Sequence, residues 1–298
     1  MAAIAFVIHY FNNNSNFGSS TGEFISELIK QNWVLPMLSF FVCLNWWLES
    51  KKWQLLLSNK EKIRTATSIQ AVFAGVTIGL FTPNRIGEYA GRLWFVKNKV
   101  FAISATVIGN ICQLSITLVF GIIALFFYKP TQKTDFSYFN VNLLYSGIFA
   151  ILVFIILYIY RKQLWKSLSN KKISSLVNLI NNARGFAKKT IIQSLLISAI
   201  RYFSFVLPFA ILLAFVYQSN LFQFLWIVPL TYFIQTFVPT FAIAEVGVRS
   251  ATIGIIMESI NLNPEPAIIV SILIWLINVM LPALIGLLII WKTKINLS

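Results

Sequence analysis

The residues of this sequence that could do chemistry are concentrated in two short charged patches. The first patch, residues 82–92, reads TPNRIGEYAGR. Its charges, Arg85, Glu88 and Arg92, are spaced at i, i+3 and i+7, which places them on one face of a helix. Ionisable residues at membrane depth are costly and usually functional. Because the surrounding sequence is strongly apolar, this patch is a candidate site.

The second patch, residues 238–250, repeats the pattern in the sequence VPTFAIAEVGVRS. Glu245 and Arg249 form an i, i+4 pair behind a proline, a residue that suits the first turn of a helix. A half-helix that begins at membrane depth directs a partial positive charge and backbone N–H groups into a cavity, which favours an anion. Over both patches, three arginines against two glutamates leave a net charge of +1.

Three roles are open for these charges. In the first, Arg85, Arg92 and Arg249 hold the phosphate of a lipid headgroup, and the two glutamates, Glu88 and Glu245, fix the arginines and limit overly tight binding. In the second, each glutamate only neutralises its arginine neighbour and stabilises a hairpin. In the third, the glutamates couple the protein to protons or other ions. We expect the first role.

The composition places the patches in a membrane protein. The chain is 58% hydrophobic and 11% charged, with a mean hydropathy of +0.77, whereas soluble domains are about 25% charged. Its apolar runs are near or above the roughly 17–25 residues that span a bilayer as a helix. We therefore expect an all-α polytopic membrane protein with about seven or eight helical membrane segments. The apolar runs are residues 33–49, 66–82, 101–128, 142–160, 190–217, 221–238 and 266–291.

Basic residues between these runs predict the orientation. Lysine and arginine concentrate in residues 50–64, 161–189 and 292–294, whereas residues 218–223 and 261–266 carry none. The positive-inside rule places the first three segments in the cytoplasm and the last two outside. We expect a multi-pass protein of the plasma (inner) membrane with a cytoplasmic C-terminus. We expect the basic residues behind the formal charge of +15 to contact anionic lipid headgroups, and we expect no nucleic-acid partner.

This orientation requires two re-entrant hairpins. Residues 66–99 must enter and leave on the same face, with the turn at Pro83–Asn84. Residues 221–262 must do so from the opposite face, with the turn at Pro239–Thr240. Inverted repeats with broken helices that meet near the midplane are typical of transporters. The expected organisation is one integral membrane domain, 1–298, with a first half at 33–160 (tip 83–92), a cytoplasmic amphipathic linker at 161–189 and a second half at 190–291 (tip 239–249).

Polar residues within the runs are secondary candidates. Arg201 lies twelve residues after Lys189, about 18 Å along a helix, so we expect it near mid-membrane with Tyr202 beside it. Three amides are expected to form helix–helix hydrogen bonds rather than ligand contacts, namely Asn110, Gln113 and Asn278. Three tryptophans beside Lys51 and Lys52 are expected to form an interfacial belt, namely Trp46, Trp47 and Trp53.

The sequence carries none of the common enzyme motifs. It has no Cys/His metal cluster, phosphate-binding glycine-rich loop, nucleophile elbow or nucleotide fingerprint. Cys43 and Cys112 lie within apolar runs and indicate small buried hydrophobic residues. We therefore expect no metal, no cofactor and no enzymatic activity. Residues 1–11 are apolar but too short to span, and two interpretations stay open: the remainder of a first span, or a misassigned start.

Both patches resemble motifs of one known family. TPNRIGEYAGR resembles the proline–arginine–glycine–glutamate–arginine motif of the lysylphosphatidylglycerol synthase transmembrane-region family, often called flippase-like. AEVGVRSATI resembles the family's second glycine–valine–arginine motif, and the resemblance covers essentially the whole chain, including 201-RYFSFVLPFAILLAF-215. It implies about eight helical membrane segments and a domain that moves lipid between leaflets. This sequence departs from the second motif at Ala244 and Ser250, where a glycine and an acidic residue are expected.

These observations predict a lipid translocase without the synthase activity, because no aminoacyl-transferase domain follows residue 298. The expected substrate and partner is an anionic phospholipid or a polyprenyl-phosphate-linked lipid of the bilayer. Envelope or glycolipid biosynthesis proteins are further expected partners. The expected substrate-binding residues are Asn84, Arg85, Glu88, Arg92, Arg201, Tyr202, Glu245 and Arg249. Two alternatives stay open: an intramembrane lipid-headgroup transferase and a non-catalytic scaffold of an envelope-synthesis complex.

Overall fold

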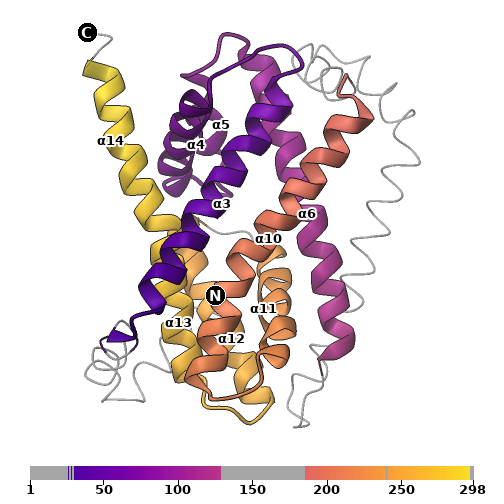
Figure 1. Ribbon diagram of the computed structural model, residues 1–298, viewed down its shortest axis with the longest axis vertical. Coiled ribbons are helices and arrows are strands. Elements are labelled where there is room, and N and C mark those ends of the chain that lie inside the picture. The colour runs from indigo at the N-terminus through magenta and orange to yellow at the C-terminus, as the bar shows by residue number, and fades with distance from the viewer. Residues whose placement is uncertain (1–25, 27, 29, 129–184, 239–240, 296–298) are drawn as a thin grey trace.

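A computed structural model describes residues 26, 28, 30–128, 185–238 and 241–295, and over these ranges the chain is helical (Figure 1). The predicted all-α fold is therefore confirmed. The predicted span at 142–160, most of the linker at 161–189 and residues 1–11 lie outside the described residues. The helices are α3 (Val34–Leu57), α4 (Thr65–Leu80), α5 (Gly87–Leu93), α6 (Lys99–Phe127), α10 (Lys188–Val216), α11 (Leu221–Thr236), α12 (Ala242–Ser259), α13 (Glu265–Trp275), the π-helix η1 (Leu276–Met280) and α14 (Leu281–Ile295).

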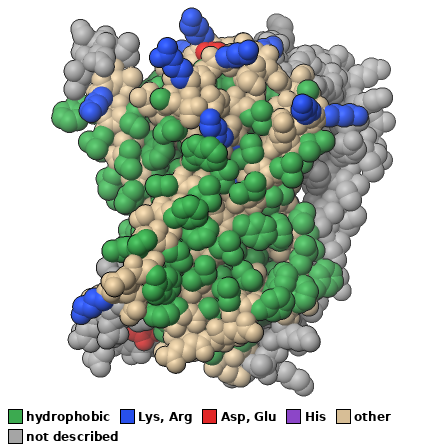
Figure 2. Space-filling model, viewed as in Figure 1, with side chains coloured by type: hydrophobic (Ala, Val, Ile, Leu, Met, Phe, Trp, Pro, Cys, Tyr) green, Lys and Arg blue, Asp and Glu red, His purple; other side chains and the backbone are tan. Residues whose placement is uncertain are grey.

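Three long apolar helices run through the height of the molecule in Figure 1. They are α6, α10 and the continuous α13–η1–α14 helix, and each contains 29 residues of suitable length and composition to cross a membrane. At the usual rise, 29 residues extend about 43 Å, which exceeds the roughly 30 Å hydrocarbon core of a bilayer. Hydrophobic side chains cover the middle of the surface, and most visible lysines and arginines gather at one end (Figure 2).

Two helical hairpins occupy opposite halves of the molecule in Figure 1. The first consists of α4 and α5, which have 16 and 7 residues, and the second of α11 and α12, which have 16 and 18 residues. A 16-residue helix extends only about 24 Å. Three of these four helices are shorter than the roughly 17 residues that span a bilayer. The re-entrant path of each hairpin, and the membrane face from which it enters, stay predictions.

The tips of the two hairpins contact each other. An antiparallel β-bridge pairs Pro83 with Phe241, although these residues are far apart in the sequence. Asn84 and Arg85 adopt left-handed backbone conformations, with φ of 49° and 56°, as residues of a tight turn do. The first turn is therefore at the predicted place, while residues 239–240 of the second lie outside the described ranges.

The tip turn changes the arrangement expected for the first patch. Helix α5 begins only at Gly87, so Arg85 precedes the helix and does not share a face with Glu88 and Arg92. The prediction of one common face is wrong for Arg85, because the helical spacing rule does not apply across a left-handed turn. Arg85 is instead directed across the tip towards the second hairpin.

Small residues bring α4 and α5 close together. Gly75 and Gly79 on α4 face α5, where Gly87 and Gly91 have the same four-residue spacing, as in membrane helix pairs. A Cβ atom added at Gly91 would lie 2.6 Å from the Ala74 carbonyl oxygen. Glycine is therefore required for this backbone contact, which fixes the position of the charged helix α5.

Helix α3 continues beyond the predicted span and buries residues expected at the membrane surface. It runs to Leu57, so Lys52 is a buried helical residue rather than part of a cytoplasmic connection. Trp46 and Trp53 are also buried, and only Trp47 of the expected belt is exposed. The belt prediction is wrong for these two, because Trp53 Nε1 donates to Thr106 Oγ1 (3.1 Å) and Trp46 Nε1 donates to the Asn278 carbonyl (3.1 Å).

Gly91→Ala should destabilise the first hairpin, because the added methyl group overlaps the α4 backbone. We expect a loss of about 1–3 kcal/mol, the usual cost of overpacking. Thermal unfolding of the purified protein in detergent measures this change. Gly247→Ala is the matched control, since no atom lies within 4 Å of a Cβ added there. Equal unfolding temperatures for the two variants would contradict the close α4–α5 contact.

Candidate functional site

Two adjoining cavities lie beside the hairpin tips. The first has a volume of about 250 Å³ and the second about 410 Å³. They share four lining residues, Asn84, Arg85, Leu114 and Thr117. Arg85 is the charged residue common to both, so the first tip forms the boundary between the cavities. Further polar residues line the first cavity, namely Glu49, Glu88, Asn110, Gln113 and Arg201.

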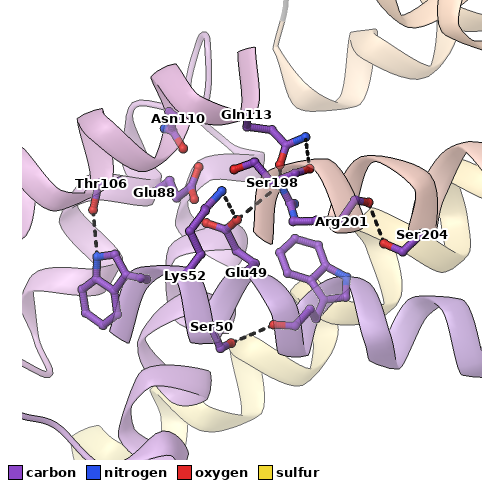
Figure 3. A network of polar contacts seen from close by, with 12 residues as sticks. Glu49, Ser50, Lys52, Glu88, Thr106, Asn110, Gln113, Ser198, Arg201 and Ser204 are labelled. Carbon is purple, nitrogen blue, oxygen red and sulfur yellow. Dashed lines mark hydrogen bonds and ion pairs between the residues drawn. The ribbon is translucent and has the colours of Figure 1, made fainter. Parts of the chain in front are cut away.

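Glu49 is the centre of a buried ion-pair network. Its carboxylate lies 2.7 Å from Lys52 Nζ, 2.9 Å from Arg92 Nη2 and 3.3 Å from Arg201 Nη1. The side chains of Glu49 and Lys52 are 4% and 1% exposed, and Figure 3 shows α3, α5, α6 and α10 contributing to this region. Sequence reasoning missed Glu49 and Lys52, although their i, i+3 spacing within a continuing helical segment was a usable signal.

Arg92 connects the first tip to this network. Its guanidinium forms ion pairs with both Glu49 and Glu88, and it lies 5.5 Å from the centre of the Trp53 ring. The Arg92 side chain is 2% exposed and lines neither cavity. Arg92 therefore lies in the wall, behind Glu49 and Glu88, which line the first cavity.

Arg201 supplies a second guanidinium to the first cavity. Its Nη1 donates to Gln113 Oε1 at 3.0 Å, and the guanidinium lies 5.7 Å from the centre of the Trp46 ring. The side chain remains 16% exposed. Arg201 lies beside the tip residues, as expected, and its depth in the membrane stays a prediction. Tyr202 is fully buried and stacks on Phe120.

The amides at depth follow the expected pattern of helix–helix hydrogen bonds. Asn110 Nδ2 donates to the Tyr89 hydroxyl (3.3 Å), and Asn45 Nδ2 donates to Asn278 Oδ1 (3.4 Å). Asn278 belongs to η1, and π-helical segments frequently occur at functional sites. Through the Asn278 carbonyl, this segment also holds Trp46, whose ring contacts Arg201.

Glu245 joins the two tips. Its carboxylate forms an ion pair with Arg85 of the first tip and with Arg249 of its own helix (3.4 Å), which confirms the predicted i, i+4 pair. Arg249 is 3% exposed and lies 5.4 Å from the centre of the Tyr232 ring. It therefore pairs with Glu245 from the buried side of that carboxylate. The Arg85 side chain is 36% exposed and faces the cavities.

The predicted site residues thus separate into two groups. Asn84, Arg85, Glu88 and Arg201 line the first cavity, and Glu245 lines the second. Three others are buried in the walls, namely Arg92, Arg249 and Tyr202. Direct phosphate binding by Arg92 and Arg249 stays a prediction, because each of these guanidiniums already contacts a carboxylate and an aromatic ring.

We call eight charged residues of these walls the tip network: Glu49, Lys52, Arg85, Glu88, Arg92, Arg201, Glu245 and Arg249. With every group ionised, five cations minus three carboxylates leave a formal net charge of +2. Uncompensated charge in a low-dielectric region is costly, so this arrangement favours an anion in the cavities. Over the described ranges, no group of three or more histidine, cysteine, aspartate or glutamate side chains could hold a metal ion.

Glu49→Gln should strongly destabilise the fold, because it leaves the buried Lys52 and Arg92 and the partly buried Arg201 without their shared carboxylate. Breaking a buried ion pair costs about 3–5 kcal/mol. Thermal unfolding in detergent tests this expectation. Glu258→Gln removes an exposed carboxylate and should leave the unfolding temperature unchanged. Similar behaviour of the two variants would show that Glu49 does not organise the network.

Cysteines at the bridged positions Pro83 and Phe241 should form a disulfide under mild oxidation. Residues paired in an antiparallel bridge have Cα atoms about 4.5–5.5 Å apart, within the range that a disulfide needs. The background would carry Cys43→Ser and Cys112→Ala. Gel mobility before and after reduction reports the cross-link. A control pair at Trp94 and Phe241 should stay unlinked, since Trp94 lies beyond the far end of α5.

Comparison with protein-family models gives one match, to the family described as lysylphosphatidylglycerol synthase TM region, over residues 3–286. Comparisons with curated proteins and with solved structures gave no significant match. The matched residues include both hairpins and every residue of the tip network. The chain therefore belongs to the lysylphosphatidylglycerol synthase transmembrane-region family, as its two charged motifs predict.

Proposed function

We propose that this protein moves an anionic lipid between the two leaflets of a membrane, with the headgroup passing through the two cavities beside the hairpin tips. The observation that carries the proposal is the position of Arg85, which lines both cavities and connects tips from opposite halves of the molecule. The family match supports a lipid-related function in a membrane. A plasma-membrane location and a cytoplasmic C-terminus are part of the proposal.

Arg85 is suited to bind the phosphate of a lipid headgroup as the headgroup moves from one cavity to the other. Its partner in the structure is Glu245, and the side chain is exposed enough to meet a ligand. A headgroup phosphate would replace the Glu245 carboxylate as acceptor, since charge-assisted hydrogen bonds from arginine suit both groups. If the phosphate and the Glu245 carboxylate replace each other as its partner, the Arg85 guanidinium is paired both before and after the lipid binds.

The cavity walls match a lipid rather than a fully polar solute. The second cavity combines the charged pair with apolar residues, including Leu114, Phe205 and Val238. The first cavity is richer in polar groups and contains Arg201. A phosphate would occupy the polar side, while the attached chains stay against apolar side chains or in the bilayer. This separation follows the amphipathic character of a lipid.

Arg85→Ala should abolish leaflet exchange, because it removes the one guanidinium that lines both cavities. Proteoliposomes with a fluorescent anionic phospholipid measure exchange as the fraction of label that an external reductant quenches over time. The expected rate is that of protein-free vesicles. Arg64→Ala is the matched control, since Arg64 is exposed and outside the tip network, and it should retain wild-type exchange.

Exchange that persists in a folded Arg85→Ala variant would overturn the proposed role of the tip. The same vesicles separate translocation from the alternatives. A changed lipid mass after incubation would indicate a headgroup transferase, and absence of exchange by the wild-type protein would favour a scaffold. Locking the tips with the Pro83–Phe241 cysteine pair should also stop exchange, and reduction should restore it, if the headgroup passes between the tips.

A further inference from the structure

The tip network holds more positive charge than its own carboxylates can balance. Glu49 contacts three cations, and Glu88 shares one of these, Arg92. Glu245 contacts both Arg85 and Arg249. Every carboxylate of the network is therefore already engaged, and a charge of +2 remains. In a buried region, ligand charge that matches this excess is strongly favoured.

We infer that the cavity beside Arg85 and Arg201 binds a lipid phosphate monoester in preference to a phosphodiester. This inference rests on the proposed function and defines its substrate class. A phosphate monoester carries a charge of about −1.5 to −2 at pH 7, whereas a diester carries −1. Only the monoester brings the network close to neutrality. A terminal phosphate also presents three oxygens to donors, one more than a diester does.

The donors of the first cavity fit a terminal phosphate. Arg85 and Arg201 both line it, and they come from the tip turn and from α10. Arg201 Nη1 is fixed by Gln113 and Glu49, while its Nε is buried without a hydrogen-bond partner. The face of Trp46 restricts the guanidinium plane. These contacts hold a donor-rich guanidinium at the cavity wall.

The neighbouring cavity indicates a lipid as the source of the phosphate. It is joined to the first at Arg85 and includes apolar side chains, among them Phe205 and Val238. A free phosphate ion has no group to place there, whereas the first carbons of a lipid do. The small first cavity, about 250 Å³, also favours a headgroup that ends at the phosphate.

The second ionisation of the ligand gives a test of the charge match. A phosphate monoester loses its second proton with a pKa of about 6, and a diester has no such ionisation. The ionisable residues facing the cavities are Glu49, Arg85, Glu88, Arg201, Tyr232 and Glu245. The described part of the chain contains no histidine. A diester with the same acyl chains, measured over the same pH range, controls for titration of the carboxylates.

The experiment compares dioctanoyl phosphatidic acid with dioctanoyl phosphatidylglycerol on the full-length protein in detergent, by calorimetric titration. At about pH 7.5 phosphatidic acid should bind about tenfold more tightly than phosphatidylglycerol, because it brings one extra negative charge into a partly buried site. At about pH 5, where the monoester carries a single charge, the ratio should fall to about threefold or less. Inorganic phosphate is the third ligand and should bind at least about tenfold more weakly than phosphatidic acid, since it lacks apolar chains.

Arg201→Gln lowers the network charge to +1 and should weaken both lipids, but the monoester more, so that the affinity ratio at about pH 7.5 falls from about tenfold to about threefold or less. Arg85→Gln makes the same charge change from the tip and serves if Arg201→Gln unfolds. Equal binding of the two lipids at both pH values, or equal binding of inorganic phosphate, would overturn the inference. Exchange of phosphatidylglycerol by the wild-type protein, lost in Arg85→Ala, would then still support the proposed function. Absence of any lipid exchange by the wild-type protein would reject that function, whatever the binding preference.

Discussion

The carboxylate of Glu49 is the contact on which the site depends. It pairs with Lys52 on its own helix, with Arg92 on the first hairpin and with Arg201 on α10, and all of these side chains are largely withdrawn from solvent. Bringing cations together in a low-dielectric region is unfavourable unless a shared anion compensates them. One acidic residue on α3 therefore links three separate parts of the chain and holds two guanidiniums near the cavities.

The second organising constraint is the meeting of the hairpin tips. The two turns lie beside each other within the molecule, where their polar groups need partners. The Pro83–Phe241 bridge and the Arg85–Glu245 ion pair supply them. Close glycine contacts between α4 and α5 place the first tip. A compact backbone arrangement thus presents one accessible arginine at the junction of two cavities.

Local sequence patterns predicted much of this architecture. Apolar runs gave the long helices, Pro83 marked the first turn, and the four-residue spacing of Glu245 and Arg249 gave their ion pair. These features depend on neighbours in the chain, so periodicity and turn chemistry suffice to find them. The common face expected for Arg85 failed because the left-handed tip turn interrupts the helical period at that residue.

The sequence by itself determined the class of protein, the two charged hairpins and the excess of basic over acidic residues at their tips. Only the tertiary structure decided which charges line the cavities. In the sequence, Glu49 and Lys52 lie at the end of an apolar run. They belong to the centre of the tip network because α10 and the first hairpin pack against α3. Ion pairs between distant segments depend on how helices pack, and spacing along a single chain does not contain that information.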